Sequence, residues 1–125
     1  TAPFIEPIDI RTGLDKLIST GAKFAFTVTS YPFPIQRAIR LTKGNRVEMV
    51  NPDCFNARSQ DLDDAWHDAG QFYWGSVSAW LDESPIFGPH ATAIILPRYR
   101  VQDIDSAEDW RQAELLFSAL KANNH

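Results

Sequence analysis

Two aspartates stand two residues apart, immediately before a strong helix start. In an extended backbone, residues i and i+2 project to the same side, so Asp103 and Asp105 can converge on one cation while Ile104 faces the core. Magnesium suits such a pair, because it takes one or two carboxylates and completes its shell with water and substrate phosphates. The spacing therefore predicts a magnesium site. The alternative is a helix N-cap with a solvated neighbour, since short motifs of this kind often occur by chance.

A helix is expected directly after this pair. Residues 106–109, Ser-Ala-Glu-Asp, resemble a capping box. Apolar side chains then recur at helical spacing and predict a buried stripe, formed by Trp110, Ala113, Phe117 and Leu120. The unpaired amides of such a helix start add a site for anions next to the predicted cation site.

A second group of polar residues lies between residues 58 and 73. Its members offer a guanidinium, two amides and an imidazole, and this inventory suits an acidic sugar: Arg58, Gln60, Gln71 and His67. The alternative is a solvated acidic loop in which Arg58 only pairs with Asp61 or Asp63, a contact that contributes about 0–1 kcal/mol. His67 taken alone also fits a buried histidine that bonds only to its neighbours.

Composition excludes several classes of protein. A chain of 125 residues has the size of one domain and buries about two-thirds of its unfolded surface on folding. The net charge of −4, without a Lys/Arg cluster, argues against a nucleic-acid partner. A single cysteine, Cys54, cannot form an internal disulfide, and no apolar run approaches the roughly 20 residues that span a bilayer. We therefore expect a soluble, cytoplasmic protein; His90 and His125 carry no signal and zinc spacing is absent.

The first third of the chain predicts a helix, a strand and a hairpin. Apolar residues recur with helical spacing from Ile10 to Ile18, and Gly21 is the expected stop. Residues 24–29 are aromatic and β-branched, which predicts a strand that ends before Pro32. Two further strands, at 38–42 and 46–50, flank a Lys-Gly-Asn connection typical of an antiparallel hairpin.

The remainder predicts an α/β fold. Residues 51–69 are polar and lack periodicity, so an ordered loop is expected, with at most a helical turn near Leu62. The segments that follow predict a strand at 70–74, a short helix at 76–81, a loop at 85–89 and a strand at 91–96. That last strand is continuously apolar, which suits a strand covered on both faces.

Four segments together resemble the acylneuraminate cytidylyltransferases, most closely their pseudaminic acid branch: residues 33–38, 58–62, 67–74 and 103–114. The similarity covers essentially the whole chain in the family's order. It implies a nucleotide-diphospho-sugar transferase-like, Rossmann-like α/β domain. It also implies transfer of CMP from CTP to the anomeric hydroxyl of a nonulosonic acid, with release of pyrophosphate.

The resemblance also implies roles for individual residues. Asp103 and Asp105 would be the catalytic carboxylates that hold Mg²⁺, with Asp105 the direct ligand. The implied or predicted contacts to the sugar are Gln36, Arg37, Arg58, Gln60, His67, Gln71 and Phe87. His67 stands where the sialic acid branch carries an arginine, so its role departs from that branch.

One family feature is absent from these residues. The family grips the CTP phosphates with a Gly/Ser/Lys/Arg-rich loop after its first strand, and residues 1–4 resemble a strand end in the middle of the family's domain. We therefore expect the C-terminal half of a longer enzyme, inactive alone. Residues 1–30 and 70–125 would form part of the α/β domain, and 31–69 an excursion for dimerisation and sugar recognition in a homodimer.

Two other functions stay open at this stage. A metal-dependent glycosyltransferase also uses an Asp-x-Asp site, and a non-catalytic sugar-binding or dimerisation module would need no metal. The residues also leave open which nonulosonic acid is the substrate, since pseudaminic, N-acetylneuraminic and legionaminic acids differ in groups that one or two contacts can distinguish.

Overall fold

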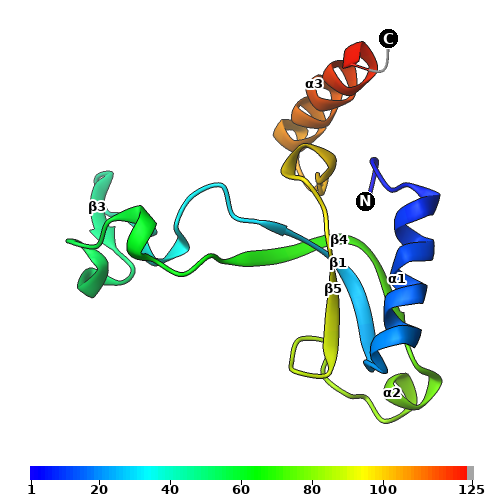
Figure 1. Ribbon diagram of the computed structural model, residues 1–125. Helices are drawn as coiled ribbons and strands as arrows, with labels where there is room; N and C mark the ends of the chain where they lie inside the picture. The colour runs from blue at the N-terminus through cyan, green and yellow to red at the C-terminus, as the bar shows by residue number, and fades with distance from the viewer. Residues whose placement is uncertain (124–125) are drawn as a thin grey trace. The chain divides into compact units, whose positions relative to one another are not determined.

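The computed structural model describes residues 1–123 (Figure 1). His125, at the end of the part expected at 70–125, therefore lies outside the described residues. Helices and strands are mixed along the chain, which confirms the α/β class. In order they are α1 (Pro7–Thr20), β1 (Phe24–Ser30), β2 (Ile39–Thr42), β3 (Arg46–Met49), β4 (Trp66–Gly75), α2 (Val77–Leu81), β5 (Ala91–Ile95) and α3 (Ala107–Asn123).

The chain divides into two compact units. The first, which we call the sheet unit, comprises Thr1–Thr29 and the chain from Asp68 onward. The second, the hairpin unit, comprises Ser30–His67. Among residues 1–123, no helix is both long enough and apolar enough to cross a membrane.

A three-stranded sheet in the order β4-β1-β5 forms the centre of the sheet unit. Strands β1 and β5 are parallel, with Phe24 opposite Ala91 and Val28 opposite Ile95. The central strand β1 holds the best-buried side chains, since Phe24 and Thr27 are fully buried. The expectation that 91–96 would be covered on both faces is wrong, because Ile94 and Leu96 are buried whereas Ile95, which points to the opposite face, is 62% exposed.

Helix α1 packs closely on the sheet. It ends where predicted, because Gly21 adopts the left-handed conformation (φ 66°) of a helix C-cap. At Gly13 a Cβ atom would lie only 2.7 Å from the Phe72 ring and 2.8 Å from the Trp74 ring. Trp74 Nε1 also donates a hydrogen bond of 2.7 Å to the Ile10 carbonyl. Glycine at position 13 therefore permits the close approach of α1 to β4.

Strand β4 is longer than predicted. It begins at Trp66, within the loop expected at 51–69, and the earlier part of that segment forms 3₁₀ turns at Pro52–Cys54 and Ser59–Asp61. The polar residue Asp68 fits inside this strand because its carboxylate accepts hydrogen bonds from the Gly70 amide and the Tyr73 hydroxyl. The short helix α2 is confirmed, with Ser76 Oγ capping the Ala79 amide at 3.2 Å.

The predicted hairpin is confirmed in the hairpin unit. Strands β2 and β3 are antiparallel, and their turn uses positive φ angles at Gly44 (74°) and Asn45 (57°). Ile39 pairs with Met49 and Leu41 with Val47, so one face of the hairpin is apolar. That face is open, since Ile39, Leu41 and Val47 are 57%, 67% and 63% exposed.

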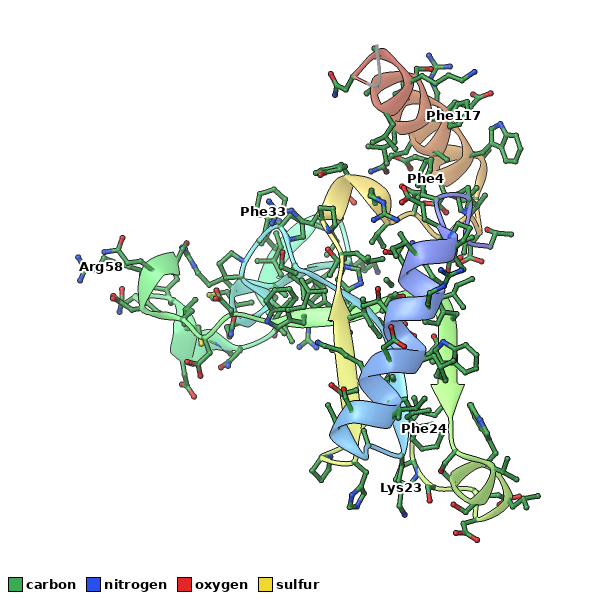
Figure 2. The ribbon with its side chains drawn as sticks, turned by 45° about the vertical axis from the view of Figure 1, so that its right-hand side comes forward. Phe4, Lys23, Phe24, Phe33, Arg58 and Phe117 are labelled. Carbon is green, nitrogen blue, oxygen red and sulfur yellow. The ribbon has the colours of Figure 1, made fainter. Side chains whose placement is uncertain are left out.

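Helix α3 differs from the prediction in its burial. Ala113 is 7% exposed, whereas Trp110 and Phe117 are 59% and 51% exposed, so the expected buried stripe is largely open. The helix faces a shallow apolar groove rather than a sheet, and Figure 2 labels Phe4 and Phe117 there. Among the residues that the structure describes, Pro3, Phe4 and Ile104 line the other side of this groove, and they leave Trp110 and Phe117 in contact with solvent.

Candidate functional site

The Asp103–Asp105 pair lies in an irregular segment between a 3₁₀ turn at Arg98–Arg100 and helix α3. Asp103 Oδ1 accepts hydrogen bonds of 3.0 Å from the Ile104 amide and 3.0 Å from the Thr1 amino group. The Asp103 side chain is 56% exposed, and Asp105 is also exposed. Both carboxylates are therefore open to a cation from solvent.

The carboxylates of Asp103 and Asp105 suit magnesium better than a metal ion whose ligands all come from the protein. Within residues 1–123, no group of three or more His, Cys, Asp or Glu side chains is placed to hold a metal ion. Magnesium commonly binds through one or two carboxylates and keeps water or phosphate oxygens for the rest of its shell. Two exposed carboxylates match the number that magnesium commonly takes from a protein when a phosphate-bearing ligand completes its shell.

The predicted capping box is present at the start of α3. The Asp109 amide donates to Ser106 Oγ at 3.2 Å, and the Ser106 amide donates back to Asp109 Oδ2 at 2.8 Å. The bond from the Ser106 hydroxyl, followed by those from the amides of Asp105 and Ser106, lowers the pKa of Asp109. Since Asp109 binds both amides, an anion at this helix start would compete with a carboxylate of the protein itself.

A polar pair on β4 lies near Asp103 and was missed in the sequence. Asp68 accepts hydrogen bonds from the Gly70 amide, at 2.8 Å, and from the Tyr73 hydroxyl. A Cβ atom at Gly70 would lie 3.9 Å from Asp103 Oδ2, so Gly70, whose amide Asp68 binds, is a neighbour of Asp103. Burial of part of the ring, the bond to Asp68 and the charges of Asp68 and Asp103 raise the pKa of Tyr73 to about 12. Asp-Ala-Gly is a turn signal that could have located Asp68.

Arg100 forms a partly buried ion cluster with the first turn of α1. Its Nε lies 3.2 Å from Glu6 Oε1, and its terminal nitrogen binds Asp9. Its side chain is 17% exposed and that of Asp9 is 10% exposed. The bond to Asp9 is the main cause that raises the pKa of Arg100, against the lowering effect of burial. No local pattern could predict this contact, because 91 residues separate the partners.

The predicted sugar contacts are distributed over both units. Five of them belong to the hairpin unit or its end: Gln36, Arg37, Arg58, Gln60 and His67. Gln71 and Phe87 belong to the sheet unit, where the Phe87 ring lies 5.5 Å from the Phe26 ring and Gln71 Nε2 donates to the Arg100 carbonyl at 3.1 Å.

Within the hairpin unit these residues make contacts of their own. Arg58 Nε donates to Asp61 Oδ2 at 3.0 Å, and both side chains are largely exposed. Gln36 Nε2 donates to the Asp63 carbonyl at 2.9 Å. The His67 ring lies 4.8 Å from the Tyr31 ring. The surface pair considered as an alternative for Arg58 therefore exists in this structure.

The hairpin unit also contains a cavity of about 180 Å³, lined among others by Tyr31, Phe33, Asp63 and Asp64. None of the predicted sugar contacts lines it. Its two aspartates would repel the carboxylate of an acidic sugar. The cavity is therefore a poor match for the acidic end of such a ligand.

Comparison with known proteins adds to this geometry. No family model matches the chain. The pseudaminic acid cytidylyltransferases of two Campylobacter jejuni strains, of serotypes O:2 and O:23/36, are each 42% identical to it over 117 residues. These alignments cover 94% of this chain and 50% of each relative, so the chain spans about half their length. A Helicobacter pylori protein named as both a pseudaminic acid cytidylyltransferase and a UDP-sugar hydrolase is 35% identical over 81 residues, which is 65% of this chain and 15% of that protein.

The resemblance predicted from four segments is confirmed: over nearly its whole length, this chain is homologous to pseudaminic acid cytidylyltransferases.

Proposed function

We propose that this chain forms the metal-binding and sugar-recognising half of a cytidylyltransferase, which transfers CMP from CTP to a nonulosonic acid, namely pseudaminic acid. The observation that carries the proposal is the 42% identity, sustained over 94% of the chain, to proteins with that name. The α/β sheet with an added hairpin is consistent with part of a nucleotidyltransferase-like domain. Because the chain spans half of those relatives, the remaining half would supply the CTP-binding loop.

In the proposed reaction, the anomeric hydroxyl of the sugar forms a bond to the α-phosphorus of CTP, and the bond to pyrophosphate breaks. Such transfers depend mainly on positioning and on neutralising phosphate charge. Asp103 and Asp105 would hold Mg²⁺, which supplies that neutralisation when bound. In this proposal the Asp68 carboxylate holds the Gly70 amide and the Tyr73 hydroxyl next to the metal carboxylates.

Sugar recognition would use the basic and amide side chains named above. Arg37 and Arg58 are both exposed and can each form paired hydrogen bonds with a carboxylate. Gln36 and Gln71 carry side-chain amides, which can both donate to and accept from hydroxyl or amide groups of the sugar. Gln60, His67 and Phe87 complete the proposed set.

A homodimer is part of the proposal. The hairpin exposes Ile39, Leu41 and Val47 on one face, and an isolated two-stranded hairpin is only marginally stable in water. A second copy of the chain that covers this face would remove its apolar surface from water. The hairpin unit would then act as the dimerisation excursion.

The direct test is an assay of pyrophosphate release with CTP and Mg²⁺. The chain would be assayed alone and as a chimera in which it replaces the homologous half of the Campylobacter jejuni enzyme. We expect the chimera to release pyrophosphate with pseudaminic acid and not with N-acetylneuraminic acid. Release with the second sugar only would overturn the choice of substrate. Silence with both sugars from a folded chimera would overturn the proposed activity.

The metal assignment has its own test in the same chimera. Asp105→Asn keeps the size of the side chain but removes its charge, so we expect turnover to be nearly abolished while thermal stability stays close to the parent. Asp15→Asn, at an exposed aspartate of α1, is the matched control and should leave turnover unchanged. Normal turnover in Asp105→Asn would exclude Asp105 as a metal ligand.

A further inference from the structure

Arg100 connects three elements just ahead of the Asp103–Asp105 pair. Its guanidinium binds Glu6 and Asp9 at the start of α1. Its carbonyl accepts a hydrogen bond of 3.1 Å from Gln71 on β4. Arg100 is the last residue of the 3₁₀ turn at Arg98–Arg100, which comes after β5 in the chain. The chain is therefore held at residue 100 by both its side chain and its backbone.

The segment that follows has no regular structure to fix its path. Residues 101–106 belong to no helix or strand. At its far end, Ser106 and Asp109 hold the start of α3 through their reciprocal hydrogen bonds. The two candidate metal carboxylates thus lie on an irregular stretch that is held at its beginning by Arg100 and at its end by a helix cap. Between them, the Thr1 hydroxyl donates to the Ile104 carbonyl and accepts from the Ile104 amide.

A buried ion pair is weak support for stability, because the cost of removing charges from water offsets much of their attraction. Its better-attested effect is to select one arrangement of the chain, since each charge must meet its partner. The Arg100 guanidinium can satisfy Glu6 and Asp9 together in only a narrow range of positions. This selection of one arrangement matters most where ligand groups must be held in place.

We propose that Arg100 is a positioning residue for the metal carboxylates, which it orients through its ion cluster with Glu6 and Asp9. This inference rests on the proposed function, because it takes Asp103 and Asp105 as the metal ligands. Arg100 itself touches neither substrate nor metal in this arrangement. Outer-shell residues that bond directly to metal ligands typically change metal affinity by about 10–100-fold when they are replaced. Arg100 acts through the backbone and not by direct contact with the ligands, so the lower end of that range is expected.

The test measures the binding of Mn²⁺, used as a magnesium probe, to the chain by isothermal titration calorimetry. We expect Arg100→Met to weaken Mn²⁺ binding by about tenfold. Arg100→Lys keeps the charge but cannot bridge both carboxylates, so its loss should be smaller. Arg40→Met, which removes an exposed arginine–carboxylate pair with Glu48 on the hairpin, is the matched control and should bind Mn²⁺ like the parent.

A second variant separates positioning from folding. In Asp9→Leu with Arg100→Met, the ion pair is replaced by apolar groups, which often preserves stability. We expect this double variant to fold and still bind Mn²⁺ about tenfold more weakly than the parent. Parent-like affinity in the folded double variant would overturn the proposal.

Amide hydrogen exchange at Ile104 provides a readout that needs no metal. The Ile104 amide donates to Asp103 Oδ1 and Thr1 Oγ1, so it reports how firmly the segment is held. We expect faster exchange there in the single and double Arg100 variants. If the parent chain binds no Mn²⁺, the metal assignment falls, and unchanged exchange at Ile104 would then also overturn the positioning role of Arg100.

Discussion

The sheet unit and the hairpin unit achieve their structure in different ways. Strand β1 of the sheet unit carries Phe24, Ala25 and Thr27 at 0% exposure. In contrast, none of the residues Ser30–His67, all of which the structure describes, is buried. The sheet unit therefore has a core of its own, whereas the hairpin unit leaves its apolar side chains uncovered. A segment with this composition depends on an additional surface for the burial that would stabilise it.

The largest expected effect follows from the core of the sheet unit. Phe24 is fully buried, and its ring packs edge-on against Trp80 at 5.0 Å. Phe24→Ala should lower the free energy of unfolding by about 3–5 kcal/mol, measured by urea denaturation. Phe55→Ala, at a hairpin-unit residue that is 68% exposed, should change it by less than about 0.5 kcal/mol. Similar losses in both variants would contradict the contrast between the units.

The second prediction tests whether another copy of the chain covers the apolar hairpin face. Leu41→Asp places a charge among Ile39 and Val47, so light scattering should show loss of the dimer while the melting temperature of the sheet unit is retained. Thr42→Asp is the control, because successive residues of a strand point to opposite faces. An equal effect of both substitutions would argue that general charge repulsion, and not this face, controls association.

The polar contacts of the sheet unit provide a third prediction. The pKa of Tyr73 is raised to about 12, and Asp68 contributes through its hydrogen bond and its charge. A raised pKa means that the folded chain holds this proton more firmly, so the stabilisation is complete below about pH 10 and is lost as the pH rises through about 12. Asp68→Asn should move the tyrosinate absorbance transition of Tyr73 toward lower pH. Subtraction of the Tyr73→Phe titration isolates this signal, and an unchanged transition would show that burial and the charge of Asp103 raise the pKa without Asp68.

Much of the fold was predictable because local signals carried it. Gly21, the Lys-Gly-Asn turn and the Ser106–Asp109 cap are each determined by neighbours a few residues away, and all three were predicted. The errors at Ile95 and Phe117 concern burial, because exposure depends on which element lies above a residue and not on its own apolar character. The same reason explains the missed Arg100 cluster, whose partners are brought together only by the packing of α1.

Arg58 in the hairpin unit carries a small expected effect on stability and the sharpest question about function. Its ion pair with Asp61 is exposed, so Asp61→Asn and Arg58→Met should each change the free energy of unfolding by less than about 1 kcal/mol. The two variants should differ in their KM for the sugar in the chimera assay. If Arg58 binds the carboxylate of the sugar, Arg58→Met raises KM for the sugar while Asp61→Asn leaves it unchanged or lowers it, because a competing carboxylate has been removed. If both variants keep the parent KM, Arg58 serves only as the partner of Asp61, and the carboxylate of the sugar must be bound by another cation, for which Arg37 is the first candidate.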